Sequence, residues 1–115
     1  MYIIIILLFL HFVGDFIFQS DKIAINKSES IKLLTLHCYV YMSLFYFCFT
    51  WSKMFYNGTI FLLLIFISHF IIDFITSRIT KKFFNEGKRY KFFITIGFDQ
   101  FLHLSILLIL NNVLL

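Results

Sequence analysis

Four apolar stretches, each close to the length of a membrane-spanning helix, make up most of the chain. A helix needs about 20 apolar residues to cross the hydrocarbon core of a bilayer. A membrane barrel strand needs only about 9–11 residues in strict alternation, and no such alternation occurs in this sequence. The pattern therefore predicts an all-α membrane protein, a four-transmembrane-helix bundle that forms a single transmembrane domain over residues 1–115. The predicted spans are residues 2–19, 33–51, 59–77 and 92–113.

The composition argues against a protein that folds in water. Hydrophobic residues make up 61% of the chain and charged residues 14%, against about 45–50% and about 25% in soluble domains. Such a chain has too little polar surface to cover a globule in water, and it is too apolar to stay disordered. The net charge of +4 comes from basic residues in short gaps between apolar stretches, which suits lipid headgroups. We therefore expect membrane lipids as partners and no nucleic acid.

The basic residues are unevenly distributed between the two sides of the predicted membrane domain. With four spans, residues 20–32 and 78–91 lie on one side, and they contain nine of the ten Lys and Arg residues. Short loops rich in Lys and Arg stay in the cytoplasm. The sequence thus predicts a multi-pass protein with both termini outside and cytoplasmic loops at residues 20–32 and 78–91.

Ionisable residues recur inside the predicted spans at a regular interval. A charged carboxylate at the centre of a membrane helix costs about 2.5–3.5 kcal/mol on insertion scales, so it needs a partner. Three His–Asp pairs are four residues apart, which places both members of a pair on one helix face. Helix rise puts all of these residues in the cytoplasmic half of the membrane or near its midplane, where they can converge. The residues are His11, Asp15, His37, His69, Asp73, Asp99 and His103.

This set of side chains predicts a divalent metal site, because imidazole and carboxylate suit Zn and also Mn, Fe, Co or Ni. The predicted metal ligands are His11, His37, His69, Asp73 and His103. Asp15 and Asp99 are predicted to act in catalysis, each as a further ligand or as a general base, and Gln19, Lys27 and Gln100 to bind substrate. Two alternatives stay open: a proton or ion path, and hydrogen bonds that hold the helices together.

A short motif occurs twice, 58 residues apart. HFVGDFI at residues 11–17 and HFIIDFI at residues 69–75 agree at five of seven positions, including the His and the Asp. Both copies run through the predicted membrane in the same direction, as in transporters with parallel repeats. The match favours a duplicated helical hairpin, with chance agreement among abundant Phe and Ile residues as the alternative.

The segment 78–91 holds six basic residues and three aromatic ones. Each basic residue in such a segment contributes about 1 kcal/mol to binding an anionic lipid surface. The residues predicted to contact headgroups are Lys81, Lys82, Lys88 and Arg89. The preference for positive charge in cytoplasmic loops accounts for the same residues without any further role.

The ordered pattern of H-x3-D-x3-Q, Lys27, His37, H-x3-D and D-Q-x2-H resembles a family of small bacterial and phage membrane proteins known as domain of unknown function 3307. The likeness covers essentially the whole chain and implies a location in the bacterial plasma (inner) membrane. It implies a polar site at His11, Asp15, Gln19, Lys27, His37, His69, Asp73, Asp99, Gln100 and His103, and it brings no activity. A weaker likeness to membrane-bound metal-dependent hydrolases contributes the expectation of a metal and no residue roles.

Three functions are compatible with these features. The first is a divalent-metal-dependent hydrolase acting on a lipid or another phosphate-containing amphiphile from the cytoplasmic side. The second is a proton or metal-ion transporter, a channel-like homo-oligomer in which the same His and Asp residues conduct. The third is a non-catalytic membrane anchor that recruits a cytoplasmic protein through residues 78–91.

Overall fold

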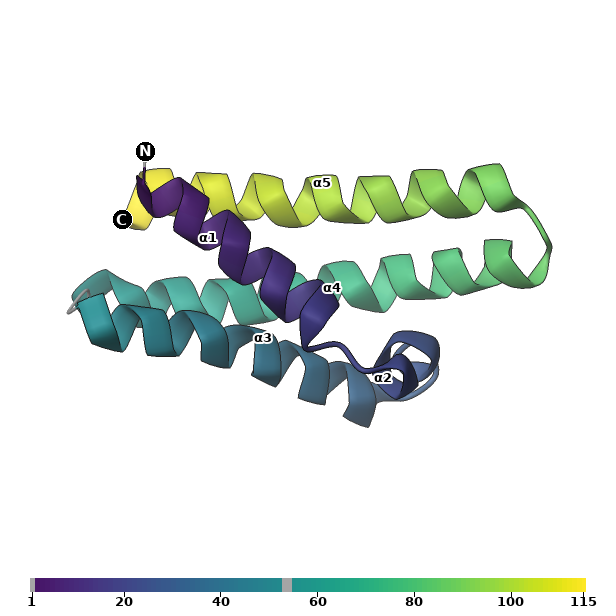
Figure 1. Ribbon diagram of the computed structural model, residues 1–115, viewed down its shortest axis with the longest axis horizontal. Helices are drawn as coiled ribbons and strands as arrows, with labels where there is room; N and C mark the ends of the chain where they lie inside the picture. The colour runs from purple at the N-terminus through teal and green to yellow at the C-terminus, as the bar shows by residue number, and fades with distance from the viewer. Residues whose placement is uncertain (1, 53–54) are drawn as a thin grey trace.

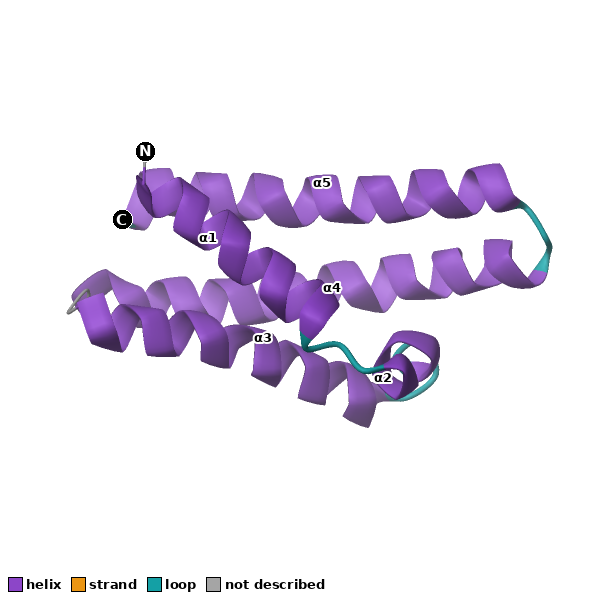
Figure 2. Ribbon diagram, viewed as in Figure 1, coloured by secondary structure: helices purple, strands orange, loops and turns teal. Residues whose placement is uncertain are grey.

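The computed structural model describes residues 2–52 and 55–115, and the side chains of residues 2–50 and 57–115. All the regular elements in this part of the chain are helices (Figure 2). They are α1 (Tyr2–Phe12), a π-helical segment (Val13–Ile17), α2 (Asp21–Asn26), α3 (Ile31–Ser52), α4 (Phe55–Asn85) and α5 (Arg89–Leu114). The predicted all-helical class is confirmed.

The three long helices run roughly along the long axis of the molecule, and α1 crosses obliquely to them (Figure 1). Helix α4 packs against both α3 and α5, while α1 contacts α3 and α5. The start of α1 and the end of α5 lie at one end of the molecule, and the turn between α4 and α5 lies at the other (Figure 1).

Three helices are long and apolar enough to cross a membrane, over Ile31–Thr50, Asn57–Asn85 and Arg89–Leu114. The stretch Tyr2–Ile17 is apolar but shorter, and at about 1.5 Å per residue it extends about 24 Å. The hydrocarbon core is about 30 Å thick. The fold is therefore compatible with a membrane protein, and the fourth span stays a prediction.

The predicted loop at residues 78–91 is mostly helical. Helix α4 continues to Asn85 and α5 begins at Arg89. Gly87 ends α4 with a φ of 68°, while Lys88 N donates to Phe83 O and Gly87 N donates to Phe84 O, as in a Schellman cap. An α-helix satisfies its own backbone hydrogen bonds, so it can continue beyond the point where the apolar run ends.

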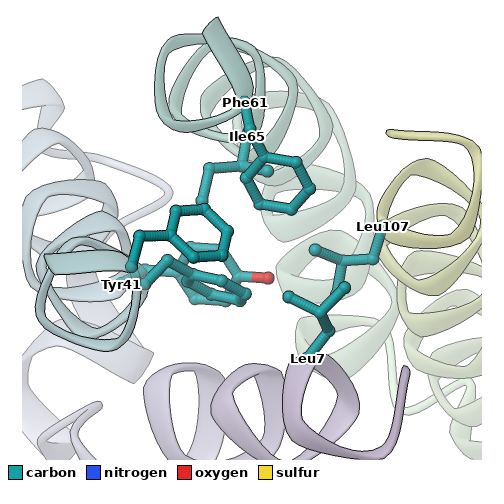
Figure 3. Close-up of a cluster of buried hydrophobic side chains, with 7 residues drawn as sticks. Leu7, Tyr41, Phe61, Ile65 and Leu107 are labelled. Atoms are coloured by element: carbon teal, nitrogen blue, oxygen red, sulfur yellow. The ribbon is translucent and has the colours of Figure 1, made fainter. Parts of the chain in front are cut away.

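Buried residues recur at intervals of about four on the inward faces of α1, α3, α4 and α5. They are apolar towards the end of the molecule where α1 begins and α5 ends, and polar further along. Side chains from these four helices point towards one another in the apolar part (Figure 3). Because lipid tails are as apolar as these side chains, the cluster holds the helices together through close packing. The apolar cluster consists of Leu7, Tyr41, Phe45, Phe49, Phe61, Ile65 and Leu107.

Gly14 allows the π-helical segment to approach α3, and its replacement should destabilise the protein. A Cβ atom at this position would lie 2.7 Å from Tyr41 Cδ2 and 3.5 Å from Tyr41 Cα. The Tyr41 ring has little room to move because it stacks on His69 at 4.0 Å between centroids. We expect Gly14→Ala to lower the free energy of unfolding in detergent micelles by about 1–3 kcal/mol.

Gly97→Ala is the matched control, because a Cβ atom there meets no other atom within 4 Å. Removing a glycine from the interior of α5 should leave stability unchanged or raise it by up to about 1 kcal/mol. Equal losses in the two variants would contradict the role assigned to Gly14.

Candidate metal centre

The predicted convergence of histidines and aspartates occurs where the inward helix faces become polar. Six of the seven residues are buried, with 1–4% of their surface exposed. The seventh, Asp99, has 15% of its side chain exposed. The buried six are His11, Asp15, His37, His69, Asp73 and His103.

Four of these residues form a closely spaced set of metal-type donor atoms. His37 Nε2 lies 3.1 Å from Asp15 Oδ1 and 3.0 Å from His69 Nε2. It is also 3.4 Å from Asp73 Oδ2. His69 Nε2 lies 3.4 Å from Asp15 Oδ1 and 3.7 Å from Asp73 Oδ2. One donor atom from each of the four residues lies within 4.8 Å of all the others.

These separations suit a small divalent ion. With ligands at about 2.0–2.2 Å, a tetrahedral zinc site has ligand–ligand distances of about 3.3–3.6 Å. The distances that involve the two imidazole Nε2 atoms, 3.0–3.7 Å, bracket that range. A hydrogen on His37 Nε2 cannot bond well to three surrounding atoms at once. The set of Asp15, His37, His69 and Asp73 therefore has the chemistry and spacing to hold a metal.

Aromatic packing orients the His69 ring. Its face stacks on Tyr41 at 4.0 Å, and its centroid lies 4.2 Å from that of His103. The Nδ1 atoms of His37 and His69 are buried and have no hydrogen-bond partner within the described structure. The orientations of the His37 and His69 rings therefore depend on ring packing and on the partners of their Nε2 atoms.

His11 lies beside this set and is not one of its members. Its Nδ1 pairs with the Tyr41 hydroxyl at 2.9 Å, and its Nε2 pairs with Gln100 Oε1 at 2.8 Å. The Gln100 amide nitrogen donates to Asp15 Oδ2 at 2.7 Å and to Asp99 Oδ2 at 3.1 Å. Both ring nitrogens of His11 are thus engaged by protein groups, and Gln100 links His11 to two carboxylates.

Asp99 and His103 extend the cluster on the α5 side. His103 Nε2 lies 3.1 Å from Asp73 Oδ1 and 3.5 Å from Asp99 Oδ1. Thr76 Oγ1 donates to Asp99 Oδ1 at 2.5 Å. Asp15, Asp99 and His103 form a second group whose donor atoms all lie within 4.8 Å of one another.

Lys27 brings a positive charge to the site from the end of α2. Its Nζ donates to Asp73 Oδ2 at 2.6 Å, and only 13% of its side chain is exposed. Burial acts to lower the pKa of this amine, but the negative charges of Asp73 and Asp15 outweigh burial and raise the pKa above its ordinary value. Lys27 therefore neutralises part of the cluster.

The remaining predicted site residues lie elsewhere. Gln19 makes no side-chain hydrogen bond to the cluster in the described structure, and its buried Oε1 lacks a partner. Lys81 pairs with Glu29 at 2.6 Å and Lys88 with Glu86 at 2.5 Å. Lys82 and Arg89 form no ion pair with any described residue, and Arg89 lies 5.8 Å from the Phe93 ring centroid.

Two contributors were missing from the predicted site, Tyr41 and Thr76. Tyr41 follows His37 by four residues, and Thr76 follows Asp73 by three, so both lie on helix faces already marked by a predicted residue. The same spacing rule that selected the ionisable residues could have found them.

Comparison with known proteins identifies a family and no activity. Neither the curated proteins nor the solved structures compared with this chain include a match, so the weaker likeness to metal-dependent hydrolases gains no support. Residues 3–115 match the family described as "Protein of unknown function (DUF3307)". The chain belongs to this family, as the order of its polar motifs predicted.

Proposed function

We propose that the protein is a membrane-embedded, divalent-metal-dependent hydrolase that acts on a lipid or another phosphate-containing amphiphile. The observation that carries the proposal is a set of four buried donor atoms, in which the two imidazole Nε2 atoms lie 3.0–3.7 Å from each other and from the two carboxylate oxygens. In this proposal Asp15, His37, His69 and Asp73 hold the ion, while His11 positions Gln100. Zinc fits the mixed imidazole and carboxylate set, and Mn, Fe, Co or Ni are the alternatives.

Charge balance supports a divalent ion. Ionised Asp15, Asp73 and Asp99 carry three negative charges, and Lys27, paired with Asp73, carries one positive charge. The cluster thus has a net charge of about −2 when all histidines are neutral, which is costly inside a membrane. One divalent ion, or two protons, would bring it to zero.

This balance predicts that metal binding releases about two protons per ion, because the metal-free cluster must hold them instead. The measurement is isothermal titration calorimetry in buffers of different ionisation enthalpy, with ZnCl2 as the titrant. Binding without proton release would show that the metal-free cluster stays charged.

A divalent ion held by Asp15, His37, His69 and Asp73 would supply a Lewis acid that polarises a phosphoryl oxygen and lowers the pKa of water. Hydrolysis of a phosphate ester breaks the P–O bond to the alcohol and forms a P–O bond to the oxygen of water. One proton of that water passes to the leaving alcohol, and the other stays on the product phosphate. Gln100 orients Asp15 and Asp99 through its amide, and Lys27 holds Asp73.

The proposed orientation follows the distribution of basic residues. Tyr2–Ile17 would insert as a fourth, tilted span, with both termini outside and residues 20–32 and 78–91 in the cytoplasm of a bacterial cell. Lys82 and Arg89 would then attract the anionic substrate at the cytoplasmic surface, at about 1 kcal/mol each. Lys82→Gln with Arg89→Gln should raise KM and preserve kcat; an unchanged KM would remove this role.

Elemental analysis and a turnover assay together test the function. Protein purified in detergent should contain a stoichiometric divalent metal, and it should release inorganic phosphate from short-chain phosphatidic acid in a chelator-sensitive reaction. Absence of metal even after reconstitution would overturn the proposal. Stoichiometric metal without turnover of phosphate esters would overturn the hydrolase and keep the metal centre.

Transport is the second candidate, and one observation favours it. Polar contacts link Tyr41 through His11, Gln100, Asp15 and His37 to the further members of the cluster, and histidine and aspartate chains of this kind conduct protons in membranes. Four helices rarely enclose a path alone, so this function needs a homo-oligomer. Zinc or proton flux in proteoliposomes that is lost in His69→Leu would support it, and a monomer without flux would exclude it.

A further inference from the structure

A second group of metal-type ligands adjoins the first and shares a residue with it. Asp15 belongs to both groups, and Asp99 and His103 complete the second. Asp73 is also close to residues of both groups. Its Oδ2 faces His37 in the first group, and its Oδ1 lies 3.1 Å from His103 Nε2 in the second. Carboxylates that face two ligand groups are the arrangement found where two ions sit about 3.5–4 Å apart.

The two groups differ in completeness. The first offers four buried protein donors, enough for a closed tetrahedral shell, whereas the second offers three. A site with three protein ligands keeps a position for water or substrate, whereas a site with four takes a substrate oxygen only by expanding to five-coordination. Asp99 has 15% of its side chain exposed, against 1% for Asp73. The second group is therefore the one that an exogenous ligand can complete.

The net charge of the cluster indicates which ligand completes the second group. One divalent ion in the first group neutralises the cluster of Asp15, Asp73, Asp99 and Lys27. A second divalent ion would leave a charge of about +2, which a phosphate dianion cancels, and metal ions in phosphate-handling sites commonly combine one or two carboxylates with substrate phosphate. The second ion and a phosphate group should therefore bind together.

We propose that Asp15, Asp99 and His103 bind a second divalent cation jointly with the phosphate group of the substrate. This inference rests on the proposed function, because it places the substrate beside the metal of the first group. It also selects between the two roles predicted for Asp99 and makes it a metal ligand. The shared Asp15 would place the two ions close enough for magnetic coupling.

Manganese binding with and without inorganic phosphate tests the inference. By electron paramagnetic resonance, the purified protein should bind about one Mn²⁺ without phosphate and about two with it, the second giving an exchange-broadened spectrum typical of paired ions. Asp99→Asn should return the phosphate-loaded value to one. Asp21→Asn, the same change at an exposed position of α2, should retain two.

The outcomes separate this inference from the proposed function. One ion under both conditions would overturn the second site and leave the hydrolase proposal intact, whereas no bound ion would overturn both. Two phosphate-dependent ions in Asp99→Asn would overturn the ligand assignment. If that variant fails to fold, the coupled spectrum of the native protein and the stoichiometry of His103→Leu decide the question.

Discussion

His69→Leu is expected to weaken divalent-ion binding by more than about 100-fold, because losing even a hydrogen-bond partner of a metal ligand costs about 10–100-fold. The leucine keeps much of the ring's volume between Tyr41 and His103 and removes the Nε2 donor that lies 3.0 Å from His37 Nε2. His69 Nδ1 has no hydrogen-bond partner to lose. The metal-free variant should therefore lose only the hydrogen bond to His37, a smaller loss of stability than in a variant that leaves two buried groups unpaired.

His11→Leu provides the matched control within the same cluster. Its imidazole bonds to Tyr41 and Gln100, so the substitution leaves two buried polar groups unpaired, at about 1–3 kcal/mol each. Stability should fall while metal affinity changes far less than in His69→Leu. Titration calorimetry and detergent unfolding measure the two effects. Loss of metal in His11→Leu with retention in His69→Leu would reverse the ligand assignment.

The contrast between these two histidines also shows how far sequence spacing can predict the site. Intervals of four correctly place His and Asp side chains on inward faces, since 3.6 residues per turn fixes the face without any knowledge of packing. The choice of partner depends on how helices cross. Asp15 lies 3.9 Å from His11 Nε2 on its own helix but 3.1 Å from His37 Nε2 on α3.

Local backbone geometry differs between the two copies of the repeated motif, although their His–Asp pairs are similarly spaced. Residues Val13–Ile17 are π-helical, and Phe18 N donates to Val13 O, five residues back. A π-turn inserts an extra residue and rotates the chain relative to a regular α-helix. His69 and Asp73, which carry the same motif, lie within regular α4 and are 3.7 Å apart. The motifs differ at two positions, Val13 against Ile71 and Gly14 against Ile72, and of these only the glycine weakens a regular helix.

The pairing of Lys27 with Asp73 lay beyond sequence reasoning for a different reason. The positive-inside rule places residues 20–32 at the cytoplasmic surface, and it applies to the segment as a whole. The rule does not show that α2 turns one amine towards the interior. That contact, 2.6 Å from Lys27 Nζ to Asp73 Oδ2, makes Lys27 a counter-charge for the site, and its role in binding substrate stays a prediction.

Lys27→Met should therefore destabilise the metal-free protein by about 3–5 kcal/mol, the usual cost of leaving a buried charge without its partner. Saturating zinc should recover much of this loss, because the ion supplies positive charge to Asp73 directly. Lys22→Met is the control on the same helix. Lys22 is exposed, so its replacement should change stability by no more than about 0.5 kcal/mol.

A double-mutant cycle with Asp73→Asn isolates the pair, since residues in direct contact show non-additive effects. The double variant should lose less stability than the sum of the losses in the two single variants. Additive losses would mean that Lys27 and Asp73 do not depend on each other.

The pH dependence of this pair has a definite sign. The pKa of Lys27 is raised in the folded protein, so the stability it contributes is fully present below the unfolded value of about 10.4 and is lost as pH rises through the folded pKa. The gap in stability between native protein and Lys27→Met should thus stay constant from about pH 7 to pH 9 and shrink only above about pH 10.4. A gap that closes near neutral pH would show that Lys27 is uncharged in the fold, and one divalent ion would then leave the cluster with a charge of about −1 instead of neutralising it.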